Sequence, residues 1–154
     1  MATDDRLGMR TAQNGRIVGP VQLATTIPIY GHAMGGKDGQ FPLNGNKIGE
    51  VAAPPSLSGV PNAFAVKVVG DSMEDRYFAG ETVFVHPRAP LRRNDFVVAQ
   101  IAGTDGDAPD AYIKQFVGWT AKHLVLRQLN PKKELEFPRQ RVVSVYRIVM
   151  GGDG

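Results

Sequence analysis

Residues 64–73 read Phe-Ala-Val-Lys-Val-Val-Gly-Asp-Ser-Met, and this stretch decides the kind of fold that the chain adopts. Its first part is rich in β-branched residues, and Ala65-Val66-Lys67-Val68 alternates as a strand does when one face lies on a hydrophobic core. The next residues, Gly70 and Asp71, are turn-forming types that end the strand. The stretch therefore predicts a half-buried strand that delivers a serine, Ser72, at its carboxyl end.

Similar short runs recur along the rest of the chain. They lie at Ile27 to Tyr30, Glu81 to His86, Phe96 to Ile101, Ala111 to Val117, His123 to Leu129 and Arg141 to Met150. The segments between them have turn-forming composition, as in Ala79-Gly80, Asn130-Pro131 and Phe137-Pro138. A helical pattern is confined to one short turn at Met73 to Tyr77. We therefore predict an all-β domain, a folded sheet or partly open barrel with very little helix.

The first 26 residues differ in texture from the rest of the chain. They mix small, polar and charged residues without a strand or helix period, and several glycines interrupt them. We interpret residues 1–26 as a disordered linker or arm, residues 27–150 as one folded domain, and residues 151–154 as a flexible tail. A chain of 154 residues suffices for a single domain of ordinary size.

Composition excludes several classes of protein. The chain has no cysteine, which rules out disulfides, thiolate metal sites and a cysteine nucleophile and favours a cytoplasmic location. Its apolar runs fall far short of the roughly 20 residues of a membrane span, and its start lacks the apolar core of a signal peptide. A net charge of +3 does not by itself indicate a nucleic-acid partner. We expect no membrane association and no cofactor.

Two features point to chemistry: the turn Gly70-Asp71-Ser72-Met73 and Lys114, which lies within the apolar run Ala111 to Val117. Serine is a weak nucleophile unless a nearby base takes its proton, and a neutral lysine can be that base. A lysine with its ordinary pKa of about 10.4 is almost entirely charged at pH 7. Burial in an apolar strand lowers this pKa because it disfavours the ammonium. Ser72 and Lys114 are thus candidates for a catalytic pair.

Plainer interpretations compete with this one. A Gly-Asp-Ser triplet after a strand is most often a simple turn, and a lysine on a strand is most often solvated. The three histidines stand on separate segments without metal-ligand spacing, so we expect no metal site; they are His32, His86 and His123. A basic cluster at Arg88, Arg92 and Arg93 has no recognition helix beside it, and we interpret it as a solvated hairpin rim.

Five segments nevertheless occur in a characteristic order. They are Gly70-Asp71-Ser72-Met73, Ala79-Gly80-Glu81, Asn94-Asp95 to Ala99, Tyr112-Ile113-Lys114-Gln115-Phe116 and Leu129-Asn130-Pro131. Together they resemble the self-cleaving C-terminal domain of LexA, the lambdoid phage repressors and the UmuD-type mutagenesis proteins. The resemblance runs from about Ile27 to Met150 and implies the folded sheet that this family shares with signal peptidase. Asn94 replaces a glycine of the family in a turn whose left-handed backbone asparagine tolerates.

The resemblance implies a role for each half of the pair. Ser72 would be the nucleophile and Lys114 the general base, with backbone N–H groups at Asp71 and Ser72 as oxyanion donors. The substrate would be a loop of the same chain, upstream of the serine. Family members cut between Ala or Cys and Gly, and no Ala-Gly pair precedes Ser72. The comparable bond is Met34-Gly35, which we predict as the cleavage site, with slow cleavage because Met fits a small pocket poorly.

The resemblance predicts the C-terminal regulatory domain of a phage-type or LexA-like transcriptional repressor. Such a domain cuts its own chain in the DNA-damage (SOS) response and makes the protein a homodimer. A RecA filament is the implied co-protease, and operator DNA would bind an N-terminal domain that lies outside this chain. Two alternatives stay open: a dimerisation module that is not cut, and a free-standing UmuD-like partner of a translesion polymerase. A helix-turn-helix segment upstream of Met1 would favour the repressor.

Overall fold

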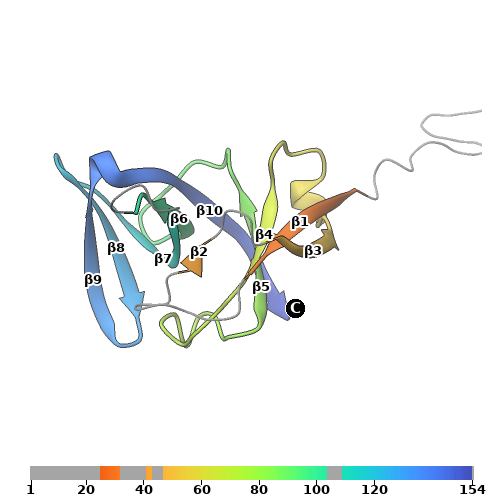
Figure 1. Ribbon diagram of the computed structural model, residues 1–154, viewed down its shortest axis with the longest axis horizontal. Helices are drawn as coiled ribbons and strands as arrows, with labels where there is room; N and C mark the ends of the chain where they lie inside the picture. The colour runs from red at the N-terminus through yellow and green to blue at the C-terminus, as the bar shows by residue number, and fades with distance from the viewer. Residues whose placement is uncertain (1–24, 32–40, 43–46, 104–108, 154) are drawn as a thin grey trace, which may run out of the picture. The chain divides into compact units, whose positions relative to one another are not determined.

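Strands make up most of the computed structural model, which describes residues 25–31, 41–42, 47–103 and 109–153 (Figure 1). The described residues form ten strands: β1 (Thr26–Tyr30), β2 (Phe41–Pro42), β3 (Lys47–Ala52), β4 (Phe64–Lys67), β5 (Glu81–His86), β6 (Phe96–Ile101), β7 (Asp110–Trp119), β8 (His123–Leu129), β9 (Lys132–Pro138) and β10 (Val142–Asp153). Two short 3-10 turns, η3 (Pro55–Leu57) and η4 (Arg139–Arg141), are the helical elements in this part of the chain. The all-β prediction is confirmed.

The sheet is open, as its strand order shows. The order is β3-β1-β4-β5-β10-β6-β7-β8-β9, and β2 pairs separately with β7. The long strand β10 joins the two parts of the sheet, because its first half pairs with β6 and its second half with β5 (Figure 1). The order has two free ends, β3 and β9, so the sheet does not close into a barrel.

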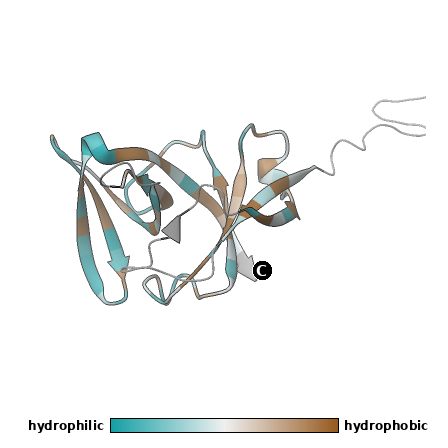
Figure 2. Cartoon of the chain, viewed as in Figure 1, coloured by the Kyte–Doolittle hydropathy of each residue, from teal (hydrophilic) through white to brown (hydrophobic). Residues whose placement is uncertain are grey.

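The sequence does not predict the two end strands, β3 and β9, and the reason is the same for both. The β3 side chains are all exposed or half-buried, and those of β9 follow the same pattern. Figure 2 shows β9 as mainly hydrophilic. An edge strand with little buried surface lacks the apolar alternation by which a strand is recognised in a sequence. Of the two proline-containing segments predicted as spacers, Asn130-Pro131 precedes β9, whereas Phe137-Pro138 forms its last two residues and pairs with β8.

Other differences from the sequence prediction are smaller. Gly151 to Asp153, expected as part of a tail, continue β10 and pair with β5. The Met73 to Tyr77 segment makes one helical turn, in which the Tyr77 N–H donates to the Met73 carbonyl at 2.9 Å, without forming a helix. Residues 1–24 lie outside the described residues, and the expected arm falls almost wholly among them.

By their internal contacts, the described residues belong to two compact units. The first unit comprises residues 25–27 and 51–60, and it contains η3 with its buried Leu57. The second unit comprises all the other described residues. Every residue of the two hydrophobic clusters described next belongs to this second unit.

The strands β6 and β7 are buried on both faces. One cluster consists of Phe64, Val66, Val68, Met73, Tyr77, Val83, Val85, Val98, Ala111, Ile113 and Ile148. The other consists of Val97, Ala99, Ile101, Phe116, Leu124 and Leu126. Neighbours such as Val97 and Val98 belong to different clusters because successive strand side chains point to opposite faces. In the middle of β7, from Ala111 to Phe116, the side chains of both faces are therefore buried or half-buried.

Tyr77 packs at the end of the first cluster against two other elements. Its side chain is 1% exposed, and its ring packs edge-on against the ring of Phe96, with 5.5 Å between the two ring centroids. A Cβ atom added to Gly151 of β10 would lie 2.8 Å from the Tyr77 ring, too close for ordinary contact. Burial raises the pKa of Tyr77 above its ordinary value of 10.0. This tyrosine therefore favours folding below pH 10, and the contribution is lost as the pH rises through its raised pKa.

We predict that Gly151→Ala lowers the free energy of unfolding by about 1 to 3 kcal/mol, because the buried Tyr77 ring has to shift. Gly49→Ala is the matched control, since a Cβ atom there would lie 3.8 Å from the nearest atom, an ordinary contact. Urea unfolding of both variants measures the difference. Equal stabilities would contradict the packing described for Tyr77.

Candidate active site

Ser72 lies in a turn that follows β4 and is held at both sides. The chain leaves the sheet after Val68, which still exchanges hydrogen bonds with Gly80 and Glu81. Gly70 then adopts a φ of 72°, a left-handed conformation that disfavours residues with a side chain. On the other side, Met73 is buried in the first hydrophobic cluster. Ser72 between them is 8% exposed, so the turn presents its hydroxyl inward.

Lys114 lies in the middle of β7, between β6 and β8. It pairs with Val97 of β6, and its side chain is 0% exposed. Its Nζ lies 3.0 Å from Ser72 Oγ, within hydrogen-bonding distance. The Tyr112 ring, two residues away on the same strand, has its centroid 5.9 Å from the Nζ. The structure thus brings together the two residues that the sequence singled out, from positions 42 residues apart.

The turn between β8 and β9 holds the backbone at the serine. The N–H groups of Leu129 and Asn130 donate to the Ser72 carbonyl at 3.1 and 2.9 Å. The Asn130 Nδ2 donates to the carbonyl of Asp71 at 3.0 Å. The sequence marks Leu129-Asn130-Pro131 as one of the five ordered segments but does not indicate a role for it. An Asn-Pro pair after an alternating strand indicates a turn, yet nothing in the sequence indicates what that turn contacts.

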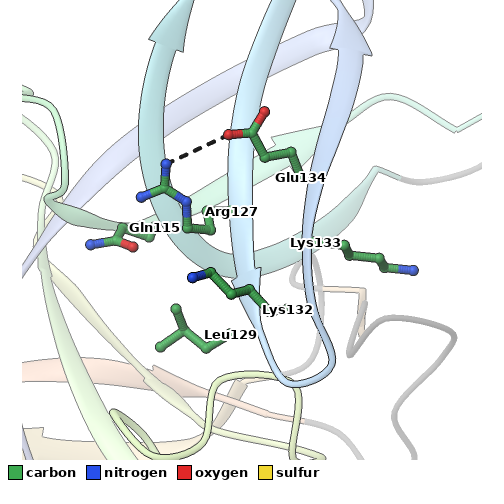
Figure 3. A pocket seen from close by; sticks show the side chains of 6 residues that line it. All are labelled: Gln115, Arg127, Leu129, Lys132, Lys133 and Glu134. Atoms are coloured by element: carbon green, nitrogen blue, oxygen red, sulfur yellow. Dashed lines mark ion pairs between the residues drawn. The ribbon is translucent and has the colours of Figure 1, made fainter.

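A hollow of about 610 Å³ adjoins this turn (Figure 3). It is lined by Gln115, Arg127, Leu129, Lys132, Lys133 and Glu134. Arg127 and Glu134 form an ion pair across neighbouring strands at 3.5 Å. The two lysines leave the hollow with an excess of positive charge. Leu129 connects it to the serine, because its N–H is one of the donors to Ser72.

The remaining predicted residues fall into two groups. Met34, Gly35 and His32 lie outside the described residues. His86 and His123 lie on β5 and β8, and no group of three potential metal ligands occurs in the described part of the chain. None of the described helical segments has the length and hydrophobicity of a membrane-spanning helix.

The loop before β6 has the conformation expected from its sequence. Asn94 has a φ of 76°, so the left-handed turn predicted at this residue is confirmed. The next residue, Asp95, accepts a hydrogen bond from the Arg92 N–H at 2.8 Å and lies 3.6 Å from the Arg147 guanidinium. At least one member of the basic cluster thus takes part in the local structure of the loop.

Comparison with known proteins supplies the family. A family model described as peptidase S24-like matches residues 17–148, which is most of the chain. The chain belongs to the peptidase S24-like family. This membership confirms the resemblance to the repressor and LexA type of domain. The match begins ten residues before Ile27, the predicted start of the domain.

One curated relative of this S24-like chain is the repressor protein C of Rhizobium phage 16-3. The two are 50% identical over 129 residues, which is 82% of this chain and 49% of the relative. The chain thus spans about half the length of that repressor. At this level of identity, the two proteins share the S24-like fold.

Proposed function

We propose that this S24-like chain is the C-terminal regulatory domain of a phage-type repressor, and that it cuts its own chain with Ser72 and Lys114. The observation that carries the proposal is the 3.0 Å contact between Ser72 Oγ and Lys114 Nζ, at a lysine with no exposed surface. The name of the phage relative supports a repressor over a free-standing UmuD-like partner of a polymerase. Operator DNA would then bind through an N-terminal domain, and a RecA filament would promote cleavage during DNA damage.

The proposed reaction is an acyl transfer that begins at the serine. Neutral Lys114 takes the Ser72 proton while the Oγ attacks the carbonyl carbon of the scissile bond. The carbonyl oxygen becomes an oxyanion, and backbone N–H groups at Asp71 and Ser72 donate to it. Lys114 then gives its proton to the leaving amine as the peptide bond breaks. A water molecule hydrolyses the acyl-serine, and Lys114 again accepts and returns a proton.

Burial supplies the base that this reaction needs. An exposed lysine with a pKa of about 10.4 is charged at pH 7 and cannot accept a proton. Withdrawal from water penalises the ammonium more than the neutral amine. The two hydrophobic clusters on either side of β7 provide this withdrawal. Burial of Lys114 therefore favours the neutral amine, which is the form that can accept the Ser72 proton.

Strand pairing supports cleavage of the same chain. β1 runs parallel to β4, with Tyr30 opposite Val66, so both strands leave the sheet at the same edge. Met34 follows Tyr30 by four residues, and Ser72 follows Val66 by six. At its other end, the connecting segment reaches β2, which pairs with the Lys114 strand β7 at Ala111. The proposed scissile bond thus belongs to a segment that starts beside the serine strand and ends on the lysine strand.

We predict that the purified protein cleaves itself faster as the pH rises from 7 to 10, without any co-protease. The physical reason is that a lysine amine loses its proton as the pH rises, and only the neutral amine can act as the base. Gel electrophoresis over a time course measures the rate. The range ends at pH 10 because ionisation of Tyr77 favours unfolding above it.

Ser72→Ala and Lys114→Ala are the controls for this experiment, and each should abolish cleavage while circular dichroism shows a folded protein. The double variant should be no slower than either single variant, because a nucleophile and its base act as one unit. A rate that stays constant between pH 7 and 10 would contradict Lys114 as the base.

We predict that cleavage occurs at Met34-Gly35 and that Met34→Ala accelerates it, since a small side chain matches the family's preference. Glycine after the bond allows close approach to the serine because it has no Cβ. Intact-mass spectrometry after alkaline incubation should find a fragment that begins at Gly35. A fragment that begins elsewhere refutes this bond, and an uncut chain in both proteins favours the alternative of a dimerisation module without cleavage.

The proposed homodimer has a candidate surface on this chain. Trp119 and Val143 are 43% and 57% exposed and line the same hollow of about 340 Å³. Leu91, Val142 and Val145 complete its apolar part. Two large exposed side chains that converge in this way form the kind of apolar patch that marks a protein interface. We assign this face to a second copy of the chain.

We predict that Val143→Glu weakens the dimer at least tenfold, because the new charge would be buried in an apolar contact. Sedimentation equilibrium across a range of concentrations measures the dissociation constant. Met150→Glu is the matched control, since Met150 is an exposed residue of the same strand outside this hollow. Equal weakening by both variants would move the interface away from this face.

A further inference from the structure

Three donors, one from the last residue of β8 and two from Asn130 in the turn that follows, bind two consecutive carbonyl groups at the serine. The Ser72 carbonyl accepts from the N–H groups of Leu129 and Asn130, and the Asp71 carbonyl accepts from Asn130 Nδ2. The donors and acceptors are far apart in the sequence, 59 residues in the case of Asn130 and Asp71. Contacts of this kind restrict the orientation of the peptide planes on which the carbonyls lie.

The direction of one N–H group follows from this restriction. The carbonyl of Asp71 and the N–H of Ser72 belong to the same planar peptide group, in which they point in opposite directions. Since the carbonyl points toward Asn130, the N–H of Ser72 points away from the turn. Among the described residues, this N–H has no hydrogen-bond acceptor. It is therefore available to an oxygen atom of a substrate beside Ser72 Oγ.

Gln128 braces the turn from inside the protein. Its side chain is 1% exposed, and its Nε2 donates to the carbonyls of Pro131 at 3.1 Å and of Asn130 at 3.4 Å. These two bonds cross the turn that carries Asn130, so they limit its movement. The side-chain amide thus stabilises the conformation from which Asn130 reaches Asp71.

We propose that Asn130 is a positioning residue that aims the Ser72 N–H at the oxyanion, with Gln128 supporting it. The inference rests on the proposed self-cleavage and adds a residue that does not touch the reacting atoms. A preorganised donor contributes to the rate because it needs no reorientation when the charge develops. Asn130 supplies that preorganisation through the plane of the Asp71–Ser72 peptide.

The test compares self-cleavage of the full chain and of Asn130→Ala between pH 7 and 10. The variant keeps the backbone donors to Ser72 and loses the side-chain donor to Asp71. We expect its rate to fall by about 10- to 100-fold, since removal of a whole oxyanion donor costs about 100- to 1,000-fold. The fall should be the same at every pH, because the substitution leaves Lys114 and its strand unchanged. A merely structural defect would instead appear as a lowered unfolding temperature.

Gln128→Leu is the second variant, with an expected smaller fall in rate and the same pH profile. Glu136→Ala is the matched control, an exposed residue of β9 outside the hollow, and it should cleave at the wild-type rate. Wild-type cleavage by Asn130→Ala overturns the inference and leaves the proposed function intact, as does a shifted pH profile. An uncut wild-type protein overturns both. Failure of both variants to fold overturns the inference by assigning the contacts to stability.

Discussion

Lys114 carries its amine into a part of the sheet from which water is excluded, and ends 3.0 Å from the hydroxyl of Ser72. A buried ammonium is costly, so the fold at this point favours the neutral base. The cover on both faces in the middle of β7 keeps this lysine out of water, whereas exposure of either face would let water solvate an ammonium there. The two hydrophobic clusters therefore stabilise the sheet and also prepare the proposed catalytic pair.

The backbone around Ser72 is also restrained. Gly70 supplies a left-handed residue before it, Met73 anchors the chain after it, and the turn at Asn130 holds the carbonyls between them. Two of these restraints lie in the turn after β4 and the third comes from the turn between β8 and β9, so no single strand decides where the hydroxyl points. Restraint of this kind lowers the entropy that a reaction otherwise loses when its groups are aligned.

This arrangement of Ser72 and Lys114 agrees with membership of the peptidase S24-like family and with the 50% sequence identity to a phage repressor. The parallel pairing of β1 with β4 explains how a segment of the same chain could serve as substrate, because both strands end at one edge of the sheet. An intramolecular substrate starts at a high effective concentration, so a modest base suffices for slow cleavage. Regulation would then act on how the segment after β1 approaches Ser72, and not on the affinity of the site for a separate substrate.

The sequence by itself determined the all-β class, most of the central strands, the left-handed turn at Asn94 and the pair of residues Ser72 and Lys114. These features depend on alternation, on turn-forming residues and on short motifs, all of which are local. The edge strands β3 and β9 escaped prediction because they bury little apolar surface and carry no such pattern. Only the tertiary structure decided that Lys114 is buried, since its environment is assembled from strands distant in the sequence. The role of Asn130 emerged only there as well, because a hydrogen bond between residues 59 positions apart leaves no trace in local composition.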